Sequence, residues 1–260
     1  MKILILEDAQ AVTLRAADIV SAQIRTLPNA VLGLATGGTM MPLYNELVRR
    51  NHAGEFSLAG ISTFNLDEYV GLPPDHPGSY HQTMLDALFK HTDIRAEATH
   101  LPRGDASDPC VEAQRYEACI AKAGGIDLQL LGIGANGHIG FNEPTSSLGS
   151  RTRVKTLTEA TRDANQQFFN SQNLVPRYAI TMGIATILEA RTCLLLATGR
   201  AKAAAVAAMV EGPVSAACPA SALQMHPKVT VVLDHGAASE LQMTDYYHQV
   251  HPNGDDFASP

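Results

Sequence analysis

The sequence predicts a three-layer α/β/α sandwich built on a mostly parallel sheet. Short apolar runs of strand length alternate with longer segments that have the apolar spacing of helices, a pattern typical of parallel sheets covered on both faces. Several of the apolar runs end in glycine-rich turns, and ligands bind at such strand ends in open α/β sheets. No internal repeat or linker divides the chain, so we expect a single domain over residues 1–260 with a polar tail from about residue 236.

Composition restricts the class of protein and its partners. The chain is 45% hydrophobic and 17% charged, with a formal net charge of −7, which is ordinary for a globular protein. No dense run of basic residues suggests nucleic acid, and no apolar run is long enough to span a membrane. The amino terminus, MKILILED, is too short in its apolar part for a signal peptide and predicts an edge strand. The four cysteines form no CxxC pair, which favours reduced thiols and a cytoplasmic protein.

The first part of the chain predicts a strand between two helices. Residues 8–26 have a helical apolar stripe that ends at Pro28, and residues 30–35 predict a buried strand. The turn TGGT at 36–39 then leads into a helix over 41–48. A glycine turn at a helix start exposes backbone N–H groups beside the positive end of the helix dipole. An anion site and a plain connecting turn are both open at this point.

A second strand, residues 61–66, leads directly into Asp67. A carboxylate at the carboxyl end of a strand is a candidate for acid–base chemistry, although a helix cap is the alternative. The Pro- and Gly-rich stretch 71–81 predicts a loop whose length suits the rim of a site. Helices are expected over 80–90 and 109–123.

Residues 128–144, LQLLGIGANGHIGFNEP, are the most informative stretch. They begin as a short apolar strand and continue into four glycines, with His138 at the strand end and Glu143 five residues later. A histidine has an unperturbed pKa of about 6.5, so it is suited to proton transfer near neutral pH. A turn with an incidental histidine is the alternative.

The second half of the chain continues the alternation. Arg151, Arg153 and Lys155 alternate along an expected strand over 146–157, so they would share one face, either an anion site or a solvated surface. Lys202 lies in the first turn of an expected helix, where a cation is unfavourable unless an anion binds there, so it is a candidate phosphate contact. The remaining elements are expected as a helix over 159–169, strands over 178–183 and 192–198, helices over 199–210 and 220–226, and a last strand over 228–234.

Three expected strand ends carry the loops TGGT (36–39), LDEY (66–69) and GANGHIGFNEP (134–144). If these strands are neighbours, the loops form a pocket with an anion cradle, a carboxylate and a His–Glu pair. Such a set suits proton transfer on a phosphorylated polar molecule without a cofactor. No GxGxxG follows a strand, so a nicotinamide cofactor is not expected, and no residues with metal-ligand spacing indicate a metal site.

Five motifs in order resemble glucosamine-6-phosphate deaminases. They are LGLATGGT (32–39), FNLDEYVGL (64–72), GIGANGHIGFNEP (132–144), SSLGSRTRVKTL (146–157) and SALQMHPK (221–228). The resemblance runs from about residue 30 to residue 234. It implies a Rossmann-like fold and the interconversion of glucosamine 6-phosphate with fructose 6-phosphate and ammonia, without a cofactor or metal.

The resemblance also implies the role of each residue. His138 would open the pyranose ring, with Glu143 and Asn136 orienting its imidazole. Asp67 would take the C2 proton of the open-chain sugar and return it to C1, with Glu68 in a supporting place. The phosphate would be held by Thr36, Gly37, Gly38, Thr39 and Lys202.

Two positions depart from the usual pattern of that family. Asn136 stands where many relatives have Asp, and an amide carries no charge to stabilise an imidazolium. Gln167 falls where the family usually has an Arg that contacts the phosphate. We therefore expect weaker phosphate binding, unless Lys202 and the backbone suffice, another cation such as Arg162 reaches in, or the preferred substrate differs.

Assembly stays open at this point. Some members of the family are hexamers activated by N-acetylglucosamine 6-phosphate, and Ser146, Arg153 and Lys155 match positions of that allosteric site. The carboxyl-terminal part of the site aligns poorly, because Tyr246 and Tyr247 fall near the expected tyrosine only with a gap. A homo-oligomer and allosteric activation are both expectations to be tested.

Two other functions compete with a deaminase. A 6-phosphogluconolactonase-like hydrolase needs a histidine but no enolising base, so the LDEY and FNEP motifs favour the deaminase. A non-catalytic sugar-phosphate sensor usually has a DNA-binding helix-turn-helix, for which residues 1–29 offer too little chain and positive charge. The expected partner is thus a small sugar phosphate, with no nucleic acid and no membrane.

Overall fold

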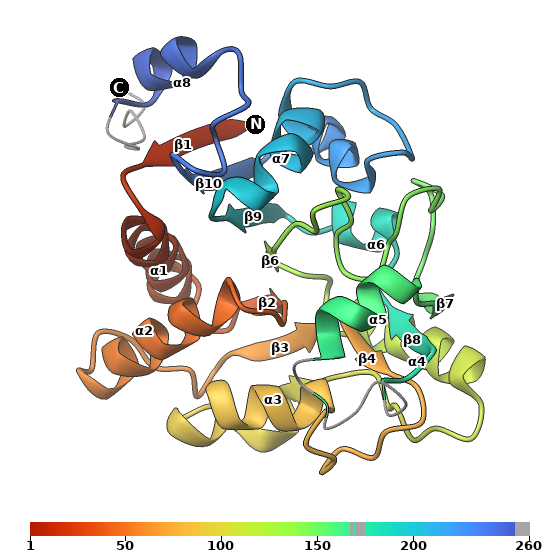
Figure 1. Ribbon diagram of the computed structural model, residues 1–260. Coiled ribbons are helices and arrows are strands. Elements are labelled where there is room, and N and C mark those ends of the chain that lie inside the picture. Colours follow the sequence, from red (N-terminus) through yellow and green to blue (C-terminus); the bar gives the residue numbers. More distant parts are fainter. Residues whose placement is uncertain (167–168, 170–174, 253–260) are drawn as a thin grey trace.

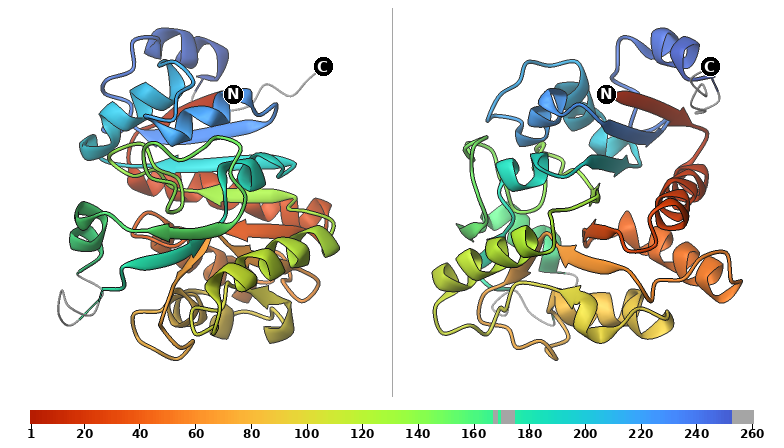
Figure 2. Two further views of the ribbon diagram at one scale, coloured as in Figure 1. Left: turned by 90° about the vertical axis from the view of Figure 1, so that its right-hand side faces the viewer. Right: turned by 180° about the vertical axis from the view of Figure 1, so that it is seen from behind.

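Seven parallel strands form the main sheet of the computed structural model, which describes residues 1–166, 169 and 175–252 (Figure 1). Their order is β1-β10-β9-β6-β2-β3-β5. Helices lie on both faces of the sheet, which confirms the expected sandwich (Figure 2). The strands are β1 (Lys2–Leu6), β2 (Val31–Leu34), β3 (Ser62–Asn65), β5 (Thr99–His100), β6 (Leu128–Leu131), β9 (Thr192–Ala197) and β10 (Val229–Asp234).

The central strands are apolar because both of their faces are covered. Every residue of β2 and β6 is buried, and so is all of β9 except its first residue. β1 lies at one edge and pairs with β10, as the amino-terminal sequence predicted. Continuous apolar runs rather than alternating ones are the signature of strands in this position.

Four of the eight α-helices in the described residues begin at a side-chain cap, namely α1, α3, α4 and α5. Asp8 accepts a hydrogen bond from Ala11 N–H at 2.8 Å, and Asp108 precedes the proline that opens α4. The helices are α1 (Ala9–Thr26), α2 (Met40–His52), α3 (Tyr80–Ala87), α4 (Pro109–Lys122), α5 (Glu159–Asn165), α6 (Ile184–Leu188), α7 (Ala203–Val210) and α8 (Thr244–Val250). Short 3₁₀ turns are η1 (Phe89–His91), η2 (Ala96–Ala98), η5 (Arg200–Lys202) and η6 (Pro219–Met225).

A second, antiparallel sheet was not predicted. It consists of β4 (Asp67–Tyr69), β8 (Tyr178–Thr181) and β7 (Arg153–Thr156), in that order, within the described residues. The expected strands over 61–66 and 178–183 therefore belong to different sheets. Periodicity reports the burial of a strand but not its partner, so the sequence alone could not separate the two sheets.

Several element ends differ from the expectation. The helix expected over 199–210 begins with a 3₁₀ turn, and the helix expected over 220–226 is a 3₁₀ turn throughout. The helix expected over 80–90 ends at Ala87. Fraying after Tyr247 was also expected, but α8 continues to Val250. The Tyr247 side chain is buried and its hydroxyl donates a hydrogen bond to Glu211 at 3.1 Å, which holds α8 in place.

The strand order reverses between β2 and β6. The chain proceeds from β2 to β3 and β5 on one side, then crosses to β6 and continues to β9 and β10 on the other. Ligands of open α/β sheets bind in the crevice outside the strand ends at such a reversal. The TGGT turn leaves β2 and the 132–144 loop leaves β6, so both border this crevice.

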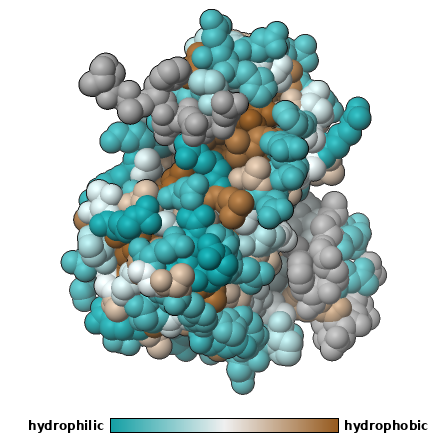
Figure 3. All heavy atoms as spheres, turned by 90° about the vertical axis from the view of Figure 1, so that its left-hand side faces the viewer, coloured by the Kyte–Doolittle hydropathy of each residue, from teal (hydrophilic) through white to brown (hydrophobic). Residues whose placement is uncertain are grey.

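The surface over α1 and α2 is mostly hydrophilic, with apolar residues in separate patches (Figure 3). These helices bury their apolar stripes inward, including Val12, Ile24 and Leu43. In the part of the chain that the structure describes, every helix is too short or too polar to cross a membrane.

Candidate active site

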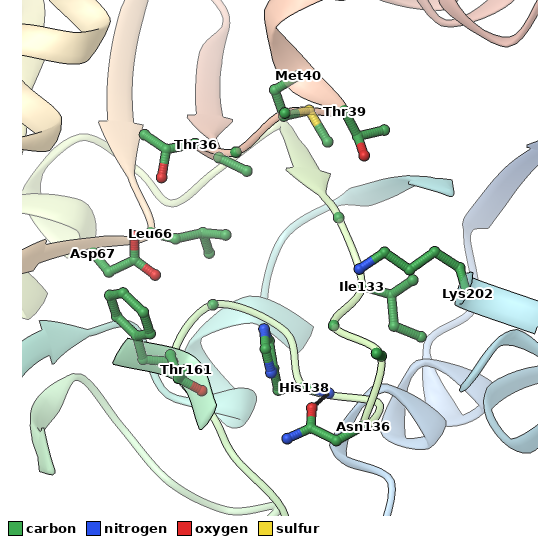
Figure 4. Close-up of a pocket in the computed structure, with 18 of the residues that line it drawn as sticks. Thr36, Thr39, Met40, Leu66, Asp67, Ile133, Asn136, His138, Thr161 and Lys202 are labelled. Atoms are coloured by element: carbon green, nitrogen blue, oxygen red, sulfur yellow. Dashed lines mark hydrogen bonds between the residues drawn. The ribbon is translucent and has the colours of Figure 1, made fainter. Parts of the chain in front are cut away.

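A cavity of about 450 Å³ lies at the reversal of the strand order (Figure 4). The three segments expected to meet do meet here, although Asp67–Tyr69 of LDEY forms strand β4 and not a loop. The TGGT turn, Asp67 and the loop after β6 all line the cavity, together with Lys202. The lining residues are Ala35, Thr36, Gly37, Gly38, Thr39, Met40, Leu66, Asp67, Tyr80, Gly132, Ile133, Gly134, Ala135, Asn136, His138, Gly140, Phe141, Thr161 and Lys202.

The TGGT turn presents backbone to the cavity. Gly37 has a φ of 114°, a conformation that favours glycine, and its carbonyl accepts the N–H of Met40 at 2.9 Å to open α2. A Cβ at Gly37 or Gly38 would meet no other atom within 4 Å among the described residues, so no neighbouring group covers this backbone. The Thr39 side chain makes no capping hydrogen bond within the described chain. The positive end of α2 is therefore open to an anion.

Asp67 is the first residue of β4 and lines the cavity opposite Lys202 (Figure 4). Only 5% of its surface is exposed. Burial raises the pKa of Asp67 to about 8, and the nearby charge of Glu68 adds to this shift. A Cβ at Gly140 would lie 3.3 Å from Asp67 Oδ2, so the glycine lets the loop after β6 approach this carboxyl group closely.

Glu68 turns away from the cavity, as the alternation of a strand requires. Its two carboxylate oxygens accept the backbone N–H groups of Tyr69, Tyr80 and His81 at 2.8–3.0 Å. Burial raises the pKa of Glu68 to about 7, and these hydrogen bonds offset part of the shift. Glu68 thus fastens the start of α3, whose first residue Tyr80 lines the cavity.

His138 lines the cavity, and Glu143 lies behind it. His138 Nδ1 lies 3.6 Å from Glu143 Oε2, and the same oxygen accepts a hydrogen bond from Asn136 Nδ2 at 2.6 Å. Thr161 Oγ1 donates to the other carboxylate oxygen of Glu143. Burial alone would raise the pKa of Glu143, but the neighbouring His138 imidazole and the hydrogen bonds from Thr161 and Asn136 outweigh it and lower the pKa to about 2. Glu143 is therefore a fixed anion beside the imidazole.

Asn136 contacts both His138 and Glu143. Its Oδ1 accepts the backbone N–H of His138 at 3.2 Å, and its amide nitrogen binds Glu143. It holds the loop and the carboxylate, and the Glu143 carboxylate faces the imidazole nitrogen.

Lys202 enters the cavity from the side opposite Asp67 (Figure 4). Burial lowers the pKa of its ammonium group. Within residues 1–166, 169 and 175–252, no carboxylate forms an ion pair with it. A half-buried ammonium group without a partner fits an anionic ligand.

Three further residues were missed by the sequence reasoning. Thr161 fixes Glu143, and the rings of Tyr80 and Phe141 stack with their centroids 6.0 Å apart at the wall of the cavity. Tyr80 could have been found, because it begins a helix directly after the expected rim loop. For Thr161 the sequence predicts only a position in a helix, and nothing that indicates a role in the site.

Arg151 does not share a strand with Arg153 and Lys155, contrary to the expectation for residues 146–157. This residue precedes β7, and its guanidinium pairs with Glu117 at 2.7 Å and with Glu189. Arg153 Nη1 donates to Asn142 Oδ1 at 2.8 Å, and Lys155 follows on β7.

The remaining expected residues lie outside the cavity lining. Ser146 is buried away from it, Arg162 does not line it, and Gln167 lies outside the described residues. Among those that are described, no group of three His, Cys, Asp or Glu side chains is arranged to hold a metal ion.

Comparison with known proteins gives consistent matches. The family model described as glucosamine-6-phosphate isomerases/6-phosphogluconolactonase matches residues 7–232. The glucosamine-6-phosphate deaminase of Hahella chejuensis is 54% identical over 250 residues, which cover 96% of this chain and 95% of that protein. The glucosamine-6-phosphate deaminase of Rhodopirellula baltica is 57% identical over 241 residues, which cover 93% of this chain and 96% of that protein.

Solved structures agree with these matches. A monomeric glucosamine-6-phosphate deaminase superposes with a TM-score of 0.90 at 47% identity, over 92% of this chain and all of that one. A 6-phosphogluconolactonase from Trypanosoma cruzi superposes with a TM-score of 0.75 at 22% identity, over 93% of this chain and 97% of that one. The second likeness is one of fold.

Proposed function

The chain belongs to the family of glucosamine-6-phosphate isomerases and 6-phosphogluconolactonases, and we propose that it converts glucosamine 6-phosphate and water to fructose 6-phosphate and ammonia. The observation that carries the proposal is the single cavity shared by Asp67, His138 and the TGGT turn. It holds a buried carboxyl group and an imidazole on one side and an anion site on the other. Such a cavity suits proton transfer along a phosphorylated sugar.

Ring opening is the proposed role of His138. The imidazole moves a proton from the anomeric hydroxyl to the ring oxygen, which breaks the ring C–O bond and forms the open-chain aldehyde. The Glu143 carboxylate beside Nδ1 stabilises the imidazolium that forms on the way, as a carboxylate does for the histidine of a catalytic triad. Asn136 and Thr161 hold that carboxylate in place.

Isomerisation is the proposed role of Asp67. Its ionised carboxylate takes the proton from C2, giving an enolamine, and returns it to C1, giving an imine at C2. Water then adds at C2 and ammonia leaves, so that the ketone of fructose 6-phosphate remains. A carboxyl group whose pKa is about 8 is a stronger base than an ordinary aspartate, which supports abstraction of a carbon-bound proton.

Phosphate binding is the proposed role of the TGGT turn and Lys202. The turn supplies backbone amides at the start of α2, and Lys202 supplies a positive charge from the wall opposite Asp67 (Figure 4). All these steps are proton transfers, additions and eliminations that the named side chains can carry out. We therefore propose that the reaction requires no cofactor and no metal.

We propose a monomer in the cytoplasm as the working form. The solved relative at 47% identity is described as monomeric, which favours a monomer over a hexamer. Arg153, one of the residues expected in an allosteric site, is held by Asn142. All four cysteines are free, which supports a reducing compartment.

The test is an assay of ammonia release coupled to glutamate dehydrogenase. We expect release from glucosamine 6-phosphate, and at least a hundredfold lower kcat/KM with free glucosamine, because the phosphate contacts are lost. Acid release from 6-phosphogluconolactone without ammonia release from the amino sugar would instead show a lactonase. Binding of glucosamine 6-phosphate without turnover would show a sensor.

A further inference from the structure

The position of Lys202 depends on a short irregular turn. Lys202 ends the 3₁₀ turn η5, and α7 starts only at Ala203. The turn follows Gly199, whose φ is 85°, and it is closed by a hydrogen bond of 3.0 Å from Lys202 N–H to the Gly199 carbonyl. The position of Gly199 therefore sets the position of the Lys202 backbone, from which the side chain extends.

Asp234 fixes Gly199. It is the last residue of β10, the strand beside β9, and both of its carboxylate oxygens accept the Gly199 N–H, at 3.0 and 2.9 Å. Oδ1 also accepts the N–H of Ala237 at 2.7 Å. Hydrogen bonds to an ionised acceptor are among the stronger ones in proteins, and Asp234 is only 9% exposed. One carboxylate thus ties the turn after β9 to the loop after β10.

Gly236 brings that loop into direct contact with the turn. A Cβ at Gly236 would lie 3.1 Å from Arg200 N and 3.2 Å from Gly199 Cα, closer than ordinary packing. The turn that carries Lys202 therefore rests on the backbone after β10 and is hydrogen-bonded to Asp234. A substitution at Asp234 would therefore move the whole turn that carries Lys202, and not merely remove one hydrogen bond.

We propose that Asp234 is a positioning residue of the phosphate site, acting on the substrate phosphate through Gly199 and Lys202. The proposal rests on the proposed function to the extent that Lys202 binds the phosphate. Asp234 itself is not among the residues that line the cavity. Its effect belongs to phosphate affinity, because Asp67 and His138 come from other strands and keep their places without it.

The test measures binding of inorganic phosphate by calorimetry and KM for glucosamine 6-phosphate. In Asp234→Ala we expect the affinity for inorganic phosphate to fall, and KM to rise, each on the order of tenfold. The value of kcat should change much less. The same substitution added to Lys202→Met should leave both constants nearly unchanged, since the group that Asp234 positions is already absent.

Asp234→Asn separates positioning from electrostatics. It removes a negative charge but keeps one acceptor oxygen for Gly199 N–H. A long-range electrostatic effect alone would strengthen phosphate binding, whereas loss of positioning weakens it. This variant also keeps the proposal testable if Asp234→Ala does not fold.

Asp127→Ala is the matched control. Asp127 is likewise buried, and its carboxylate accepts Val31 N–H at 2.7 Å and pairs with Arg191 at 2.6 Å, next to the amino end of β6. It should lose stability but keep its KM and phosphate affinity.

Two results would overturn the proposal: unchanged phosphate affinity in both Asp234 variants, or an equal loss with and without Lys202. If the wild type released no ammonia, the proposed function would fail, yet phosphate calorimetry on the same variants would still decide the role of Asp234.

Discussion

At the scale of single residues, two buried carboxyl groups of the cavity have opposite pKa shifts. Burial, with little to offset it, raises the pKa of Asp67 to about 8. Glu143 is buried too, but hydrogen bonds to its ionised form lower its pKa to about 2. Pairs of carboxyl groups with pKa values driven apart by their surroundings are typical of divided acid–base roles. Here the division supports Asp67 as the base and Glu143 as the permanent anion.

Asp67→Asn should lower the activity and raise the stability of the protein. We expect kcat to fall about a thousandfold, since the general base is lost, with little change in KM. Because the folded pKa of Asp67 is raised from 3.8 to about 8, the wild type loses stability as pH rises through this window. The variant escapes this loss.

Thermal unfolding at several pH values checks this prediction. The melting temperature of Asp67→Asn should exceed that of the wild type by a margin that grows from pH 4 to pH 8. A difference in melting temperature that does not depend on pH would mean that burial does not raise the pKa of the Asp67 carboxyl group.

Asn136→Asp should lower kcat/KM. The Asn136 amide nitrogen lies 2.6 Å from Glu143 Oε2, so a carboxylate here would face a carboxylate. The repulsion would displace Glu143 from His138 or force it to take up a proton. Steady-state kinetics from pH 6 to 9 should show the loss deepening as pH rises. A gain in activity would instead show that a second negative charge helps the imidazolium.

At the scale of elements, the strand–turn–helix unit β2–TGGT–α2 forms the proposed anion site. The strand is buried, the glycines leave the backbone uncovered, and the helix start has no side-chain cap within the described chain. Each of these features follows from local residue types, so the sequence could predict the anion site as one option. The glycine at position 37 is required by its φ of 114° rather than by a lack of space.

Gly37→Ala should raise KM for glucosamine 6-phosphate several-fold and leave kcat closer to the wild-type value. An alanine is strained at this φ, so the turn would shift and its amides would no longer face the phosphate. The control is Gly124→Ala, at the end of α4, where φ is 87° and a Cβ is equally uncrowded. Both variants should lose similar stability in urea unfolding, but only Gly37→Ala should change KM. Equal KM values in the two would refute a role for the turn in binding.

At the scale of the whole molecule, the reversal of the strand order assembles the cavity. It places the loops after β2 and β6 on either side of one crevice, while the small sheet β4-β8-β7 brings in Asp67. Thr181, opposite Asp67 across this sheet, accepts Phe141 N–H at 3.1 Å. The two sheets together thus hold the loop of His138 against Asp67.

Sedimentation velocity at micromolar concentration should show a monomer. The rate should also depend hyperbolically on glucosamine 6-phosphate and be unaffected by N-acetylglucosamine 6-phosphate. The physical reason is that the Arg153 guanidinium is already bound to Asn142 and Arg151 is in ion pairs, so neither is ready for an added phosphate. A sigmoidal curve that the N-acetylated sugar phosphate makes hyperbolic, together with a larger particle, would contradict this prediction.

The sequence by itself determined the alternation of strands and helices, the class of the fold and the three loops that carry the chemistry. These features depend on local patterns: apolar periodicity, glycines at turns and capping residues at helix starts. The LDEY and GHIGFNEP motifs were sufficient to name Asp67, His138 and Glu143, and a cation in the first turn of an expected helix named Lys202. All of these except Glu143 line the cavity. Glu143 lies directly behind His138.

Only the tertiary structure decided which strands pair, what surrounds each carboxyl group and how Lys202 is held. The separate antiparallel sheet, the contact of Thr161 with Glu143 and the hold of Asp234 on Gly199 each join residues far apart in the chain. A local pattern reports whether a side chain is buried, but not against what. A pKa or a position depends on those distant neighbours, because desolvation and hydrogen bonding act through space and not along the sequence.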